Sequence, residues 1–102
     1  MTNGWTVVPL HGDLDDFSSR DVRRLFDALT DEGATRVVVD LTAVGFLDST
    51  GLNVLLGAAR RARLERGALR LAGAVPRVRD LVELSGVATV LPLYPDVAAA
   101  CV

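Results

Sequence analysis

The sequence of 102 residues predicts one α/β domain over residues 1–102, with helices flanking a mostly parallel central sheet of about four strands. Apolar β-branched runs alternate with stretches whose apolar residues recur every three to four positions, which indicates strands alternating with amphipathic helices. A glycine or a proline stands near most of the junctions. No internal repeat or linker divides the chain, so we expect a single domain.

Composition and charge exclude several classes of protein. Half of the residues are hydrophobic and 24% are charged, which is ordinary for a globular protein. The net charge of -2 gives no reason to expect nucleic acid as a partner. We expect no membrane insertion and a cytoplasmic location, because the chain has neither a long uncharged apolar run nor the features of a signal peptide. The single cysteine, Cys101, fits a reducing compartment.

In the first third of the chain we expect a strand over residues 5–10, a loop over residues 11–16 and then a helix. The helix start resembles a capping box that begins at Ser18, with Phe17 and Val22 spaced as a hydrophobic staple. Gly33 is expected to end the helix. Its inner face is predicted from apolar residues at helical spacing: Val22, Leu25, Phe26 and Leu29.

The middle of the chain is the most informative segment. A continuous β-branched run predicts a strand over residues 36–41 that is covered on both faces, followed by a short loop. A helix is predicted from about Thr50 to Gly67. Its buried face is expected from residues at helical spacing: Leu52, Leu55, Leu56 and Ala59.

In the last third we expect a short strand over residues 68–72 and a helix that begins at Pro76 and closes at Gly86. A last strand is predicted over residues 89–91, and the start of a final helix over residues 96–102. The alternation of strands and helices predicts right-handed crossovers between parallel strands.

Polar groups gather where two of these strands are expected to end. In parallel sheets functional groups lie just past the carboxyl ends of strands, and Asp15, Asp48 and Ser49 occupy such positions. Ser49 and Thr50 fall in the first turn of a helix, where free N–H groups and the helix dipole favour an anion. A phosphate carried by either hydroxyl would be well placed.

Catalysis has little support in the sequence, and we expect a protein that is not an enzyme and holds no metal or other cofactor. A hydrolase elbow needs glycine two residues before the serine, but Leu47 precedes Ser49 there. One histidine, His11, and one cysteine are too few for a typical metal site. A phosphate-binding loop with lysine is excluded, because all eleven basic residues are arginines.

Three ordered motifs carry a resemblance to a known family. Residues 40–56, DLTAVGFLDSTGLNVLL, are similar to the signature segment of the STAS domain, in particular of bacterial anti-sigma factor antagonists. Residues 10–15, LHGDLD, resemble the upstream motif of that family, and residues 77–87, RVRDLVELSGV, resemble its third helix and the turn after it. The resemblance covers nearly the whole chain and implies a STAS-like fold.

The resemblance also implies a partner switch. In this family the first hydroxyl residue after the aspartate, here Ser49, is phosphorylated by an anti-sigma factor that is also a serine kinase. The unphosphorylated antagonist captures the anti-sigma factor and frees a sigma factor, phosphorylation ends the capture, and a phosphatase resets the cycle. Thr50 stands where a second serine is commoner and is the alternative phosphoacceptor. A monomer or weak dimer is expected.

Plainer roles remain open for each of these residues. An N-cap is the commoner role of a serine or threonine before a helix and is open for Ser49 or Thr50, and Asp48 can stabilise the helix start by its charge alone. Asp15 suits a turn, and Gly51 suits backbone freedom. A second interpretation is a STAS subunit of an ABC-type lipid transport assembly without phosphorylation control. The expected partner-binding residues are Asp15, Asp48, Ser49, Thr50, Gly51, Asn53, Gly57 and Arg60.

Overall fold

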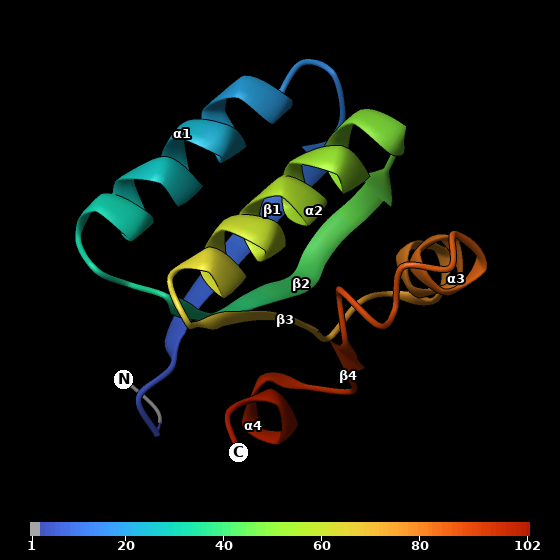
Figure 1. Ribbon diagram of the computed structural model, residues 1–102. Coiled ribbons are helices and arrows are strands. Elements are labelled where there is room, and N and C mark those ends of the chain that lie inside the picture. Colours follow the sequence, from blue (N-terminus) through green and yellow to red (C-terminus); the bar gives the residue numbers. More distant parts are fainter. Residues whose placement is uncertain (1–2) are drawn as a thin grey trace.

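The computed structural model of the chain describes residues 3–102. Strands and helices alternate in it: β1 (Thr6–Leu14), α1 (Ser19–Asp31), β2 (Arg36–Leu47), α2 (Ser49–Leu64), β3 (Ala68–Ala72), α3 (Pro76–Leu84), β4 (Leu93–Tyr94) and α4 (Val97–Ala100). Helices α1 and α2 lie side by side along one face of the sheet, and α4 lies near the N-terminal end of the described chain (Figure 1).

The sheet has the order β1-β2-β3-β4, and all three neighbouring pairs of strands are parallel. The predicted parallel four-stranded sheet is therefore confirmed. β1 is an edge strand, where the missing N–H of Pro9 is tolerated. β2 is central, and the side chains of Val38, Val39 and Leu41 are completely buried, as the continuous apolar run predicted.

The larger core lies between the sheet and its covering helices. Leu52, Leu55 and Ala59 of α2 are buried in it, and Leu56 is partly buried, which confirms the predicted inner face. From α1 only Phe26 among the expected residues is fully buried, and Val22 and Leu29 are partly buried. The prediction was wrong at Leu25, which is exposed.

A smaller core covers the opposite face of the sheet, because Val38 alternates with neighbours that point into the larger one. Trp5 is buried there, with the guanidinium groups of Arg36 and Arg70 stacked 4.5 and 4.2 Å from its ring centroid. Arg70 also donates a hydrogen bond to the carbonyl oxygen of Ala100 at 2.8 Å. The same side chain thus ties α4 to the sheet. Cys101 is buried nearby.

Two expected loops are strand instead. β1 continues to Leu14 and β2 to Leu47, although residues 11–14 and 42–47 were predicted as loops. Parallel pairing of β1 with β2 continues through two register shifts, one between Pro9 and His11 and the other between Gly12 and Asp13. Irregular pairing of this kind tolerates exposed polar residues and glycine on an edge, so local composition did not reveal it.

The predicted strand at residues 89–91 is also wrong. The N–H groups of Val90 and Leu91 both donate to the carbonyl oxygen of Val87, at 2.9 and 2.8 Å, and this turn buries Leu91. The last strand is β4, which follows Pro92 and pairs with the end of β3. The β-branched and apolar residues 89–91 predict extended backbone, but a compact turn buries Leu91 instead.

Replacement of a core residue on α2 should destabilise the protein strongly. Leu55 is fully buried and Leu64, on the same helix, is 84% exposed. Leu55→Ala removes buried methyl groups and leaves a cavity, so we expect the free energy of unfolding in urea to fall by about 2–5 kcal/mol. Leu64→Ala is the matched control, expected within about 0.5 kcal/mol of wild type. Equal effects of the two changes would contradict this packing.

Candidate functional site

The ends of β1 and β2 come together at one edge of the sheet. Leu14 pairs with Leu47, and the next backbone N–H, that of Asp48, donates to the carbonyl oxygen of Leu14 at 3.1 Å. The loop that begins at Asp15 and the start of α2 at Ser49 therefore share this edge, as the sequence predicted for the carboxyl ends of parallel strands (Figure 1).

Asp48 is the N-cap of α2. One of its carboxylate oxygens accepts a hydrogen bond from the Gly51 N–H at 2.9 Å, which satisfies an amide that has no partner within the helix. The alternative in which Ser49 or Thr50 is the cap is therefore wrong. Both lie inside the first turn, where Ser49 is exposed and Thr50 is half-buried. The Ser49 hydroxyl therefore does not cap the helix.

Gly51 is buried where α2 crosses the end of β1. A Cβ atom at Gly51 would collide with the carbonyl oxygen of Leu14, the same oxygen that accepts the Asp48 N–H. The glycine is therefore required by a close approach inside the chain. Neither a contact with a partner nor backbone freedom alone explains it.

Asp15 organises the loop between β1 and α1. Its carboxylate accepts hydrogen bonds from the N–H groups of Phe17 and Ser18 at 3.0 and 3.1 Å, the pattern of a turn stabilised by an aspartate side chain. The Ser18 hydroxyl donates to the carbonyl oxygen of Asp13 at 2.6 Å and makes no capping bond to α1. The predicted capping box is therefore wrong at Ser18.

The predicted staple between Phe17 and Val22 is also wrong. Phe17 is 95% exposed, whereas Val22 is half-buried against the core. The turn around Asp15 directs the backbone so that the two side chains do not pack together.

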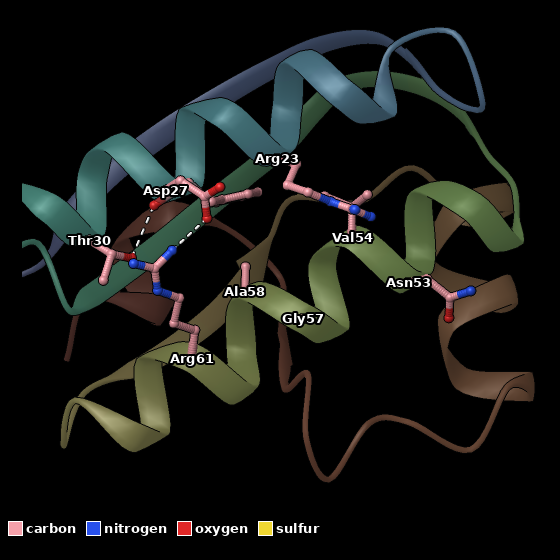
Figure 2. Close-up of a pocket in the computed structure, with 9 residues that line it drawn as sticks. Arg23, Asp27, Thr30, Asn53, Val54, Gly57, Ala58 and Arg61 are labelled. Atoms are coloured by element: carbon pink, nitrogen blue, oxygen red, sulfur yellow. Dashed lines mark hydrogen bonds and ion pairs between the residues drawn. The ribbon is translucent and has the colours of Figure 1, made fainter.

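A groove of about 230 Å³ runs between α1 and α2 (Figure 2). Asn53 and Gly57, two of the expected partner-binding residues, line it from α2. Arg61 reaches across the groove to Asp27 of α1, with the charged atoms 2.6 Å apart. Arg23 lines the groove from the α1 wall and Val54 from α2 (Figure 2). Arg60 is exposed and does not line the groove.

Gly57 leaves the groove open in the middle of α2. A Cβ atom at this position would meet nothing within 4 Å, so packing does not require glycine. Glycine costs a helix interior about 1 kcal/mol relative to alanine. The helix thus carries a residue of low helix propensity where it borders the groove. The α1 wall was missed by sequence reasoning, because its position depends on how the two helices pack.

Within residues 3–102, no group of three or more His, Cys, Asp or Glu side chains is arranged to hold a metal ion. None of the helices in that range is long and apolar enough to cross a bilayer. The polar groups at this edge of the sheet are the exposed Ser49, the N-terminus of α2 and the carboxylates of Asp15 and Asp48.

Comparison with known proteins gives a consistent result. The STAS domain family model matches residues 1–100. The chain is 32% identical to an anti-sigma F factor antagonist of Paenibacillus polymyxa, over 91% of this chain and 80% of that protein. The crystal structure of an anti-sigma factor antagonist from Mycobacterium paratuberculosis superimposes with a TM-score of 0.85 at 29% identity, covering 95% of this chain and 82% of the other.

A third similar protein shares the fold alone. The Bacillus cell fate determinant SpoIIAA, solved in the phosphorylated form, superimposes with a TM-score of 0.72 at 24% identity, covering 97% of this chain and 90% of the other. The arrangement of strands and helices described above is thus also that of a protein that carries a phosphoryl group.

Two glycines of α2 should respond oppositely to alanine. Gly51→Ala forces a Cβ atom against the Leu14 carbonyl oxygen and should lower the free energy of unfolding by about 1–3 kcal/mol. Gly57→Ala meets open space and should raise it by up to about 1 kcal/mol. Urea unfolding of both variants checks this. Stabilisation by Gly51→Ala would contradict the close approach between β1 and α2.

Proposed function

The chain is a member of the STAS domain family, and on that premise we propose that it is an anti-sigma factor antagonist controlled by phosphorylation of Ser49. Its partner is an anti-sigma factor with serine kinase activity. The unphosphorylated chain captures this partner and so frees a sigma factor, and the phosphorylated chain does not. A phosphatase returns it to the active form.

The observation that carries this proposal is the position of Ser49. Its side chain is exposed in the first turn of α2, and the neighbouring Asp48, not Ser49, supplies the cap. A kinase must bring a hydroxyl within about 3–3.5 Å of the terminal phosphate of ATP. The exposed Ser49 is open to such an approach, whereas Thr50 is half-buried, which favours Ser49 as the acceptor.

The fold supports a phosphoserine at this position. Phosphorylation adds a charge of about -1.5 to -2 at neutral pH. The free amides of the first helical turn and the positive end of the helix dipole both stabilise such a charge. Asp48 opposes it by like-charge repulsion, but the site is open to water, which screens this repulsion. The modified chain is therefore expected to stay folded, so that the change is read at the interface.

Binding is sensitive to the same modification. While the serine lies against the partner's nucleotide, a phosphoryl group added there brings its negative charge against the phosphates of ATP or ADP. The phosphoryl group must also lose its water of hydration when the interface forms, which costs free energy. A loss of about 3 kcal/mol weakens binding more than a hundredfold. The switch is thus a local electrostatic event that needs no change of fold.

The partner surface extends from this edge along α2. Near Ser49 it includes Thr50, Asp48 and Asp15, while Gly51 acts indirectly by letting β1 and α2 approach each other. Two turns further along the helix, Gly57 opens the groove to a side chain of the partner. Asn53 at the groove and Arg60 beside it are both exposed and complete the proposed surface.

Phosphorylation of Ser49 should be directly measurable. We expect incubation with ATP and the kinase-type anti-sigma factors of the same genome to add one phosphate, detected by mass spectrometry of the intact protein. Ser49→Ala should abolish the added mass, because no other hydroxyl is as accessible in that turn. Thr50→Val, which keeps the shape of the side chain, is the matched control and should be phosphorylated normally.

The outcomes separate the alternatives. Phosphate that persists in Ser49→Ala and disappears in Thr50→Val would move the acceptor site to Thr50 and leave the mechanism unchanged. No phosphate and no binding with any candidate would contradict the proposal and favour the transport-subunit interpretation, in which this hydroxyl is not modified.

Filling the groove should weaken binding without harming the fold. Gly57→Leu places a large side chain in the open space over α2, so we expect a dissociation constant at least tenfold higher for the kinase partner and an unfolding midpoint no lower than that of wild type. Arg77→Leu, an exposed position on α3, is the control for added apolar surface. Unchanged binding of Gly57→Leu would exclude the groove from the interface.

A further inference from the structure

Phe17 is the most exposed large hydrophobic side chain among residues 3–102, with 95% of its surface open to solvent. Burial of a phenylalanine side chain stabilises a fold, but this fold leaves the ring of Phe17 in water. Single exposed apolar residues are common on protein surfaces and need no explanation by themselves. Phe17 differs in how firmly its backbone is held and in what lies around it.

Hydrogen bonds fix the backbone of Phe17 on both sides. Its own N–H and that of Ser18 donate to the Asp15 carboxylate at 3.0 and 3.1 Å, and the Ser18 hydroxyl donates to the Asp13 carbonyl oxygen at 2.6 Å. The ring therefore projects from an ordered turn. An aromatic side chain on a preorganised loop loses little entropy on binding, which is the property of an interface anchor.

The turn lies at the same edge of the sheet as the phosphorylation site. Leu14, immediately before the turn, accepts the Asp48 N–H through its carbonyl oxygen. A second aromatic residue, Phe46, is 42% exposed and pairs in register with Asp13. Two exposed aromatic residues thus occur near the ends of β1 and β2, the strand ends that adjoin Asp48 and the start of α2.

The surroundings of Phe17 are acidic. Residues 11–21 contain four aspartates and one arginine. In the described chain the carboxylates in ion pairs belong to α1 and α3, and none of Asp13, Asp15, Asp16 and Asp48 is among them. A surface that binds here must combine an apolar pocket with positive charge at its rim.

We propose that Phe17 is the aromatic anchor of the interface with the kinase-type anti-sigma factor, and that it enters an apolar pocket of that partner rimmed by basic side chains. This rests on the proposed function. Phe17 holds the partner while Ser49 meets the nucleotide, so it determines affinity and takes no part in phosphoryl transfer. The binding energy at Phe17 is present before and after the chemical step.

The test compares two equally exposed apolar residues. Phe17→Ala removes a side chain that is 95% exposed. Leu84→Ala, at the end of α3, removes one that is 87% exposed. Isothermal titration of the unphosphorylated full chain with the purified kinase-type ATPase that phosphorylates Ser49 should give a dissociation constant about 30-fold or more higher for Phe17→Ala. Leu84→Ala should bind as wild type does, and both should unfold at the wild-type urea concentration.

Kinetics supply a second readout. For Phe17→Ala we expect a raised KM for phosphorylation with unchanged kcat, because the lost contact is the same in the ground state and the transition state. Phe17→Trp, which keeps an aromatic ring, should restore binding. Wild-type affinity of Phe17→Ala would overturn the anchor while leaving the proposed function intact. Failure of the wild-type chain itself to bind or to be phosphorylated would remove both.

Discussion

The carbonyl oxygen of Leu14 makes the contacts on which the site around Asp48 and Ser49 depends. It accepts the Asp48 N–H and lies against Gly51, so one backbone atom sets the position of α2 relative to the end of β1. The loop after β1 and the helix that carries Ser49 are thereby held as one unit. No residue with a Cβ atom fits at position 51. The position of Ser49 therefore depends on Gly51, a buried residue that need not touch any partner.

This arrangement separates the residues that stabilise the fold from the hydroxyl that is proposed to be phosphorylated. The buried residues of α2 hold the helix on the sheet, while its first turn leaves a hydroxyl in water. A phosphoryl group added at that end meets amides and the positive end of the dipole, and it need not disturb the core. The same charge is costly only where a second protein has excluded water. Under the proposed function, the modification would therefore act on an association and leave the domain itself intact.

The sequence predicted the elements whose residues are buried in a regular pattern. β3, the start of α3 at Pro76 and the inner face of α2 were all correct, because periodicity records which side chains leave water. The edges were less predictable. β1 and β2 continue past their apolar runs because they pair with each other, and pairing between distant segments leaves little mark on local composition. The sequence left a cap at Ser49 or Thr50 open and gave Asp48 only a charge role, whereas Asp48 is the cap, since hydroxyls and carboxylates both suit that position.

The failed prediction at Phe17 is the more informative one. Residues 17–22 have the spacing of a staple, yet the Asp15 carboxylate captures the Phe17 N–H and turns the ring outward. Two local arrangements exclude each other at Phe17: packing against Val22, and the hydrogen-bonded turn at Asp15. The protein adopts the turn. Natural sequences agree with local rules over most of their length, and departures concentrate where function imposes another requirement. An aromatic ring held in water by an ordered turn is such a departure. It follows a strand whose end lies next to the start of α2, where Ser49 is exposed. Under the proposed function, a partner that binds this end of the sheet would account for both features.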